Sequence, residues 1–316
     1  MKNKCVLLCF LPFLLTSCSS PMKDSFLCFD TTISYSIYGM SFLDTRFIND
    51  TFSIMDSLFD SYHQRGVTNV YSINQTNEEV DIGESVLYGI LEKSLQVQSR
   101  GATYFNPLCG SLSKLWKESL DKKQVLSQEV IDAEFAKINS SNLLLKDDYK
   151  VQRVGEAEID LGGIAKGYAL DVAKDYLESK EVTNYIINAG SSSILLGEKN
   201  TKDGLYNIGI KDIKNAYFKA KNCFVSTSGI REQLTIIDSV KYSHIVNPVT
   251  GSVVPKHDTV IVITDSGFYG DALSTSMMMN TVEEIQQIEI DHNVKAIVID
   301  DNQITYKNSE IEVYYH

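Results

Sequence analysis

The chain has 316 residues, of which 43% are hydrophobic and 22% are charged, and its formal net charge is −12. This length is ample for a large core and is compatible with one elaborate domain or with two subdomains. The acidic balance disfavours nucleic acid and anionic lipid surfaces as partners.

Residues 1–17 have the pattern of a secretory signal peptide. Two lysines precede an apolar run from Cys5 to Leu15, and small residues stand directly before Cys18. LTSC at 15–18 is also typical of a bacterial lipobox, although a secreted protein with an incidental cysteine is the alternative. We therefore expect a lipid on Cys18 that anchors the chain to a membrane of the bacterial cell envelope, outside the cytoplasm and on the periplasmic side. No later segment reaches the ~18–20 apolar residues of a membrane span.

The first half of the chain reads as a tether followed by mixed elements. Residues 18–28 are expected to be a lipidated tether, and the folded domain is expected over 29–316. TTISYSIYG alternates like a half-buried strand, and 42–61 has helical spacing. Residues 63–82 are polar and rich in turn formers. Helices are expected over 85–99 and from Ser127 onward, with strands near 142–153.

The second half is dominated by short apolar runs. Runs at 184–210, 216–246 and 259–264 are separated by Gly, Asn and Asp, which favours antiparallel strands. Thr281 and Glu284 have the spacing of a capping box, and AIVIDD at 296–301 begins a terminal hairpin. Helices interspersed with hairpins predict an α+β fold. Cys28, Cys109 and Cys223 remain after the leader and the lipidated cysteine; because this number is odd, at least one is free, and we expect all three to be.

Residues 160–167, DLGGIAKG, form the most informative motif. Small and apolar residues recur at helical spacing after it, so a helix should begin near Ile164. Gly162 and Gly163 let a ligand approach the backbone, and the first amides of the helix favour phosphate. Lys166 adds a cation at the same end. The spacing is neither that of a P-loop nor that of a dinucleotide-binding turn, and the alternative is a glycine turn that serves packing alone.

A second motif, GDALSTSMMMN, places Asp271 and Thr275 four residues apart with Ser274 beside them. On a helix these oxygens project from one face, and one carboxylate with one hydroxyl suits Mg²⁺ better than zinc or calcium. The alternative is that Asp271 is merely an N-cap.

A third motif, YSHIVNPVTG at 242–251, predicts a tight turn preceded by His244. His244 could serve as a general base or as a phosphate partner. A satisfied structural histidine is the alternative, because the five histidines of the chain show no metal-binding spacing.

Together these segments resemble the ApbE-like family of bacterial FAD:protein FMN transferases. The matching segments are DLGGIAKGYALD (160–171), NAGSSSILLG (188–197), STSG (226–229), YSHIVNPVTG (242–251), DALSTS (271–276) and, more weakly, NPLCGSLSKLW (106–116). The resemblance implies an ApbE-like, T-fold-like architecture of antiparallel sheets with packed helices. Asn106 stands where the family usually carries Asp, and NAGSSS replaces a commoner double-glycine-Asp form.

The resemblance also implies a reaction. FMN would be transferred from FAD to a threonine hydroxyl of an acceptor protein through a phosphoester bond, with release of AMP and with Mg²⁺ as cofactor. The acceptor would be a membrane-associated redox subunit. The implied catalytic residues are His244 as base and Asp271. The implied metal set is Asp271, Thr275 and the Gly163 carbonyl, with Ser274 nearby. The implied FAD contacts are Asp160, Lys166, Phe29, Tyr62, Tyr104, Phe105, Asn106 and Val246.

Three alternatives stay open at this point. Water in place of the threonine would make the same site an FAD pyrophosphatase that yields FMN and AMP. A lipoprotein that binds flavin without turnover would use the same pocket. For the aromatic residues, Phe105 above all, ordinary core packing is the alternative to flavin contact.

Overall fold

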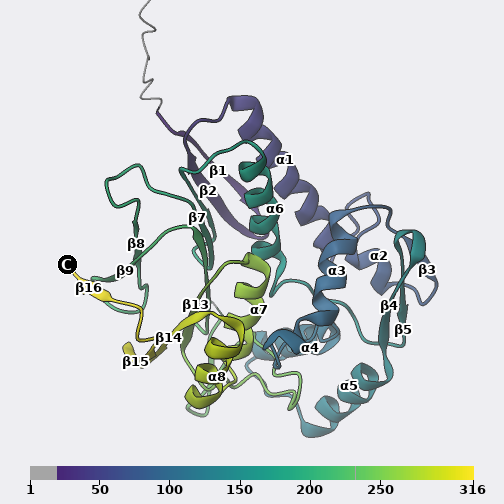
Figure 1. The fold of residues 1–316 in the computed structure, drawn as a ribbon. Coiled ribbons are helices and arrows are strands. Elements are labelled where there is room, and N and C mark those ends of the chain that lie inside the picture. The colour runs from purple at the N-terminus through teal and green to yellow at the C-terminus, as the bar shows by residue number, and fades with distance from the viewer. Residues whose placement is uncertain (1–19, 232) are drawn as a thin grey trace, which may run out of the picture.

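A central antiparallel sheet organises the computed structural model, which describes residues 20–231 and 233–316 (Figure 1). Eight strands of the described residues follow the order β1-β2-β6-β7-β10-β13-β14-β15. Each neighbouring pair is antiparallel, as the short apolar runs predict. Their bounds are Met22–Cys28, Thr31–Ile37, Tyr185–Ala189, Ser193–Leu196, Cys223–Gly229, Thr259–Thr264, Lys295–Asp300 and Gln303–Lys307. These findings confirm the α+β class.

Helices cover one face of this sheet (Figure 1). They are α1 (Phe42–Phe59), α6 (Ala165–Ser179), α7 (Gly267–Met277) and α8 (Val282–His292). α1 contacts β1, α6 contacts β7, α7 contacts β10 and β13, and α8 contacts β14. The main apolar core contains Phe52 of α1, Phe224 of β10 and Phe268 of α7. The removal of these apolar side chains from water is the principal favourable contribution to the free energy of folding.

A small sheet covers the opposite face. It has the order β16-β9-β8, with bounds Val313–Tyr315, Ala216–Ala220 and Tyr206–Gly209. Phe218 of this sheet packs in a second core with Val225, Ile261 and Ile297 of the central sheet. Because successive side chains of a strand point to opposite faces, β10 supplies Phe224 to one core and Val225 to the other. Burial on both faces explains the continuous apolar sequences of β13 and β14.

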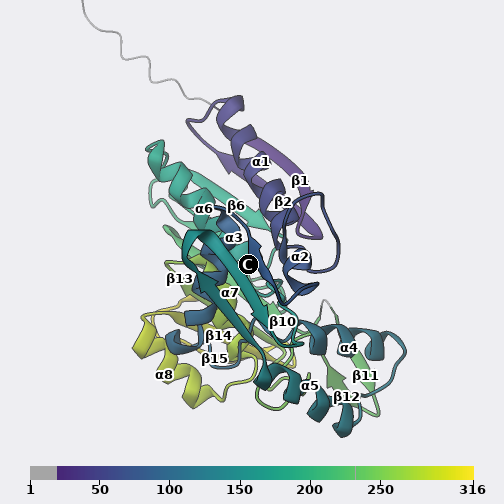
Figure 2. The same ribbon diagram turned by 90° about the vertical axis from the view of Figure 1, so that its right-hand side faces the viewer.

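The remaining elements form the side of the molecule that carries a third sheet. This sheet has the order β3-β5-β4, with bounds Glu79–Asp81, Lys150–Val154 and Asn142–Lys146. Around it lie α2 (Val70–Asn74), α3 (Val86–Gln96), α4 (Gly110–Asp121), α5 (Gln128–Ser140) and the hairpin β11 (Thr235–Ile237) with β12 (Val240–Tyr242). The short 3-10 turns η1 (Gln98–Arg100) and η2 (Asp147–Tyr149) complete it. Figure 2 shows α4, α5 and the β11–β12 hairpin gathered at one end. The main core runs through this side too, since it includes Leu91 and Trp116.

Most predicted helices are confirmed, with the capping box formed by Thr281 and Glu284. The structure also has elements that the sequence does not predict. α2 and β3 lie within the segment that reads as polar and turn-rich. α4 is not among the predicted helices, although Leu112, Trp116 and Leu120 follow one another at four-residue spacing and are buried.

Part of the predicted tether is folded. Residues 22–28 form the edge strand β1, which pairs with β2 from Met22↔Ile37 to Cys28↔Thr31. Of its seven residues only Cys28 is fully buried, so the sequence MKDSFLC lacks the alternation that marks a half-buried strand. The folded part therefore includes Met22, whereas the sequence places the boundary at residue 29. The predicted signal peptide and Cys18 lie outside the described residues.

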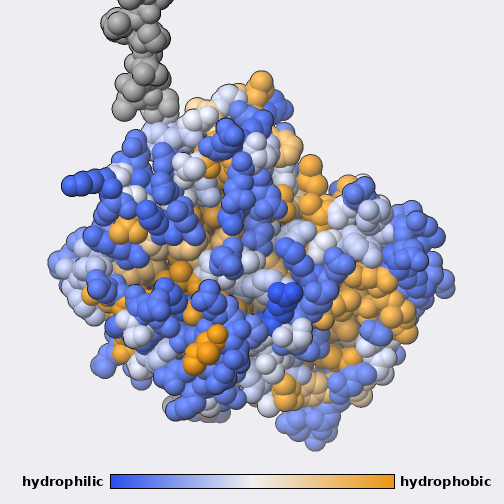
Figure 3. Space-filling view, in the orientation of Figure 1, coloured by the Kyte–Doolittle hydropathy of each residue, from blue (hydrophilic) through white to orange (hydrophobic). Residues whose placement is uncertain are grey.

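The surface seen in Figure 3 is mostly hydrophilic, with separate hydrophobic areas at its upper end and between α3 and the β4–β5 hairpin. Within the described ranges, no helix combines the length and the apolar character needed to cross a membrane.

Candidate active site

One cavity of about 860 Å³ collects the predicted site residues. It opens where the N-terminus of α6, the interior of α7, the ends of β6 and β10, and the loop after β12 meet. The predicted residues that line it are Phe29, Tyr62, Tyr104, Phe105, Asn106, Asp160, Gly163, Lys166, His244, Val246, Asp271, Ser274 and Thr275. The structure thus brings every candidate among the described residues into one place, while the individual roles stay predictions.

The glycine turn leads into α6 as predicted. The Leu161 carbonyl accepts the amides of Ile164 at 3.0 Å and of Ala165 at 2.9 Å, and the helix begins at Ala165. Before it, the amide of Gly162 donates to Asp160 Oδ1 at 2.8 Å. The pKa of Asp160 lies above its ordinary value because burial disfavours the charged form. The Gly162 amide and the nearby Lys114 oppose this rise. The Asp160 carboxylate is therefore held in place beside the cavity.

Gly163 leaves little room for a side chain. A Cβ at this position would lie 3.1 Å from Phe105 Cε2 and 3.9 Å from Thr275 Oγ1. Phe105 is buried in the main core and also lines the cavity, so core packing and the predicted flavin contact are compatible. Gly163 therefore lies between Phe105 of the main core and Thr275 of α7.

Asp271 is not an N-cap, so that interpretation is wrong. The N-cap of α7 is Ser266, and Asp271 lies inside the helix with only 6% of its surface exposed. Its Oδ2 accepts the amide of Gly167 at 2.7 Å, and its Oδ1 accepts the hydroxyls of Ser193 at 2.7 Å and Ser226 at 2.8 Å. The pKa of Asp271 lies above its ordinary value because burial disfavours the charged form. Lys166 and these three donors oppose this rise. Asp271 therefore caps α6 from a different helix.

This contact has a consequence for the Gly163 carbonyl. Gly167 stands four residues after Gly163, and in a continuing helix its amide would bond that carbonyl. Because the amide turns to Asp271 instead, no donor among residues 20–231 and 233–316 reaches the Gly163 carbonyl. The oxygen remains available to a ligand from the cavity.

The hydroxyl groups of α7 complete the polar wall. Ser228 Oγ lies 2.9 Å from Ser274 Oγ and 3.2 Å from Thr275 Oγ1. Ser274 also donates to the Asp271 carbonyl at 3.1 Å, so its hydroxyl already has two partners. Thr275 is the hydroxyl closer to Gly163.

These oxygens fit a magnesium ion. The set contains one carboxylate, one or two hydroxyls and a main-chain carbonyl, all hard oxygen donors of the kind that Mg²⁺ accepts together with water and substrate phosphates. Oδ2 of Asp271 has one hydrogen bond and keeps a second lone pair. Within the described part of the chain, no group of three or more His, Cys, Asp and Glu side chains is arranged to hold a metal ion, so a site of the zinc type is not built there.

His244 lies at the cavity, three residues before a hydrogen-bonded turn. Asn247 Oδ1 accepts the amides of Val249 at 2.8 Å and Thr250 at 3.1 Å, as predicted for a tight turn. Trp116 Nε1 donates to the Gly251 carbonyl at 2.7 Å, which fixes the turn against α4. The His244 side chain is exposed, unlike that of a core histidine. It is thus accessible to a molecule that enters the cavity.

The FAD contacts predicted from the resemblance differ in their surroundings. The ring of Phe29 stacks on Phe59 at 6.3 Å between centroids, and Tyr62, 48% exposed, has Lys114 Nζ 4.9 Å from its ring. The Tyr104 amide donates to Ser276 Oγ at 2.9 Å. Asn106 Oδ1 accepts the amide of Leu108 at 2.9 Å, so this oxygen serves the turn before α4.

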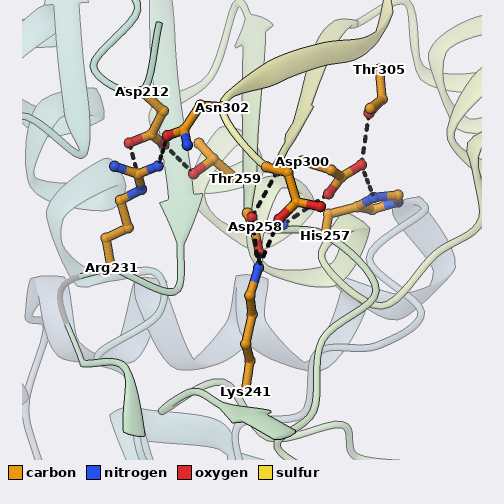
Figure 4. Close-up of polar contacts among 10 residues, drawn as sticks. Asp212, Arg231, Lys241, His257, Asp258, Thr259, Asp300, Asn302 and Thr305 are labelled. Carbon is orange, nitrogen blue, oxygen red and sulfur yellow. Dashed lines mark hydrogen bonds and ion pairs between the residues drawn. The ribbon is translucent and has the colours of Figure 1, made fainter. Parts of the chain in front are cut away.

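A network of charges holds one rim of the cavity (Figure 4). Arg231, just after β10, pairs with Asp212 at 2.9 Å, and Thr259 at the start of β13 donates to the same carboxylate. Nearby, Lys241 pairs with Asp258 at 2.8 Å, and His257 contacts Asp300. Asp212, Arg231 and Thr259 line the cavity but are not among the predicted site residues. No local signal marks them, since their partners are distant in the sequence.

Ser193 is likewise absent from the predicted site, whereas the sequence marks Ser226 and Ser228 as part of a polar turn that could line a ligand or simply end a strand. The structure places Ser226 against Asp271 and Ser228 against Ser274. The three serines lie in NAGSSS and STSG, segments that carry the family resemblance. That resemblance was the available signal, because serine alone does not distinguish a turn from a carboxylate partner.

Comparisons with known proteins identify the family of this chain. A model of the ApbE family matches residues 29–298. An FAD:protein FMN transferase of Vibrio cholerae is 24% identical over 283 residues, 84% of this chain and 81% of that protein. One of Chlamydia trachomatis is 26% identical over 297 residues, 86% of this chain and 89% of that protein. The match to the FAD:protein FMN transferase of Treponema pallidum is 27% identical and covers 60% of this chain but only 58% of the relative. The match to the FAD:protein FMN transferase of Rhodobacter capsulatus also covers 58% of the relative.

Solved structures show the same fold. The ApbE protein of Thermotoga maritima superposes with a TM-score of 0.78 at 23% identity and covers 92% of this chain and 97% of that one. The flavin transferase ApbE of Vibrio cholerae gives a TM-score of 0.73 at 20% identity, with 93% and 96% covered. Since the family model matches most of the described residues and the folds agree, this chain belongs to the ApbE family.

Proposed function

We propose that this chain is a Mg²⁺-dependent FAD:protein FMN transferase that attaches FMN to a threonine of an acceptor protein. The relatives named above support the transfer of flavin. The observation that carries the proposal is the contact of Asp271 with the Gly167 amide, which leaves the Gly163 carbonyl available beside Thr275. A carboxylate, a hydroxyl and a free carbonyl at a helix N-terminus form a site for a pyrophosphate with its cation.

The reaction needs one bond made and one broken. The threonine oxygen forms a bond to the phosphorus atom of the FMN half of FAD, the bond from that phosphorus to the bridging oxygen breaks, and AMP leaves with that oxygen. A Mg²⁺ ion held by Asp271, Thr275 and the Gly163 carbonyl, with Ser274 nearby, would offset charge on the phosphoryl oxygens.

The chain's own groups do the remaining work. The amides of Ala165 and Gly167 already have acceptors, so the main-chain amide and the ammonium group of Lys166 bind phosphate oxygens and fix the pyrophosphate. His244, exposed at the cavity, takes the proton of the threonine hydroxyl as general base. Asp160, Tyr62 and the other predicted FAD contacts orient the substrate, so that the phosphorus lies in reach of the hydroxyl.

The location also belongs to the proposal. The lipobox at 15–18 supports a protein lipidated on Cys18 and attached to a membrane of the bacterial envelope on the periplasmic side. A membrane-associated redox subunit is the kind of acceptor that such an anchor would favour.

AMP release tests the reaction. Purified protein is incubated with FAD and Mg²⁺, alone, with a threonine-bearing acceptor peptide, and with the matched peptide in which alanine replaces the threonine. We expect AMP and a flavin-modified peptide with the threonine peptide only. AMP with free FMN in all three reactions would show a pyrophosphatase instead, and FAD binding without AMP would show a carrier.

A further inference from the structure

α6 and α7 share a short motif, a glycine followed four residues later by an aspartate. Residues 167–171 read GYALD and residues 267–271 read GFYGD. Since residues four apart lie on one face of a helix, each helix presents a glycine and a carboxylate side by side. The two helices are neighbours on the helical face of the sheet (Figure 1).

The contacts between the two motifs are reciprocal. The Gly167 amide donates to Asp271 Oδ2 at 2.7 Å, and the Gly267 amide donates to Asp171 Oδ1 at 2.7 Å. Asp171 Oδ2 also accepts the Phe268 amide at 3.0 Å. Each helix therefore caps the N-terminus of the other with a carboxylate, where unpaired amides and the helix dipole favour negative charge. We call Gly167, Asp171, Gly267 and Asp271 the helix clasp.

The glycines of the helix clasp allow the backbones to touch. A Cβ on Gly167 would lie 2.0 Å from the Gly267 carbonyl oxygen, and a Cβ on Gly267 would lie 2.3 Å from the Gly167 carbonyl oxygen. Contacts this short are impossible, so any side chain at either position would force the helices apart. Asp271 reaches the Gly167 amide only because of this approach.

We propose that Asp171 is a positioning residue for the phosphate and metal site. By accepting the first two amides of α7, it fixes the start of that helix against α6. Asp271 lies one turn after Gly267 on α7, and Thr275 lies one turn after Asp271. The contact of Asp171 with the start of α7 therefore also sets where both side chains lie relative to Gly163. Asp171 does not line the cavity, so its effect on the site passes through α7. This inference rests on the metal assignment made under the proposed function.

Metal binding without turnover tests the proposal. Mn²⁺ replaces Mg²⁺ as a probe, and binding to the full chain is measured from the loss of the free Mn²⁺ signal in electron paramagnetic resonance. We compare wild type with Asp171→Ala and with Asp171→Asn, which keeps one acceptor oxygen and the size of the side chain. We expect the Kd for Mn²⁺ to rise at least tenfold in Asp171→Ala and less in Asp171→Asn. FAD transfer should recover towards the wild-type kcat at high Mg²⁺.

Asp175→Asn is the matched control, since Asp175 lies one turn further along α6 and is exposed. Its Kd for Mn²⁺ should stay within twofold of wild type. If the Asp171 variants lose thermal stability but bind Mn²⁺ as wild type does, Asp171 is only structural and the proposal is wrong. If wild type itself binds no Mn²⁺, the metal assignment fails first, and the positioning role fails with it. Should Asp171→Ala not fold, Asp171→Asn decides the matter alone.

Discussion

Replacing Asp271 separates its structural role from its chemical role. The carboxylate accepts three hydrogen bonds, from the Gly167 amide, the Ser193 hydroxyl and the Ser226 hydroxyl. In Asp271→Asn the amide oxygen can accept from Gly167, and the NH₂ group can donate to both serines, whose hydroxyls rotate to accept. All three bonds are kept while the charge is lost. Because burial raises the pKa of this carboxyl, its charge is costly in the fold, and the variant should be as stable as wild type or more so.

Asp271→Ala behaves differently. The serine hydroxyls can turn to other partners, whereas the Gly167 amide is fixed and loses its acceptor. A buried unsatisfied donor costs about 1–3 kcal/mol. With about 2 °C for each kcal/mol in a domain of this size, Tm should fall by about 2–6 °C.

The assay combines thermal unfolding without divalent ions, Mn²⁺ binding, and FMN transfer. Both variants should lose Mn²⁺ binding and transfer, and only Asp271→Ala should lose stability. Asp265→Asn, an exposed residue just before α7, serves as the control. Wild-type Mn²⁺ affinity in Asp271→Asn would refute the ligand role. Equal destabilisation of both variants would refute the hydrogen-bond assignment.

Three further predictions concern other parts of the site. Gly167→Ala should lose about 1–3 kcal/mol of stability, measured by denaturant unfolding, because its Cβ would lie 2.0 Å from the Gly267 carbonyl oxygen. Gly209→Ala, where a Cβ meets no atom within 4 Å, should be neutral, and equal losses would contradict the clash. His244→Ala should slow single-turnover FMN transfer by about 10²–10⁴-fold while FAD affinity is kept, and a normal rate would remove His244 from the mechanism. Burial raises the pKa of the Cys109 thiol from 9.0 to about 12. The unfolded thiol therefore ionises first, and stability should fall above pH ~9 by up to about 1.4 kcal/mol per pH unit. Rapid alkylation of Cys109 at pH 8, seen by peptide mapping, would contradict this burial.

Features that depend on neighbouring residues were predictable from the sequence. The start of α6 and the capping box of α8 follow from short-range patterns, and the structure has both. The turn at 247–251 also depends on local hydrogen bonds of Asn247. In each case the groups that satisfy one another lie within a few residues.

Long-range partners could not be predicted in this way. Ser193 and Asp271 are 78 positions apart, and only the strand order brings them together. The DxxxT spacing is the same whether Asp271 begins a helix or lies inside one. In the structure Asp271 lies inside α7, and Ser266, five residues earlier, is the N-cap. Strand β1 was not predicted for another reason. An exposed edge strand buries too few side chains to show an alternating pattern of apolar and polar residues.

The early start of β1 would restrict how far the folded chain can move from a lipid on Cys18. If Cys18 carries the lipid, only residues 19–21 separate it from Met22, the first residue of the strand. At no more than about 3.6 Å per residue, this link spans at most about 14 Å, far less than a free tether extending to residue 28 would allow. The cavity then samples a thin layer above one leaflet. An acceptor threonine on a protein of the same membrane would meet it at a raised effective concentration, while one in free solution would gain nothing from the anchor.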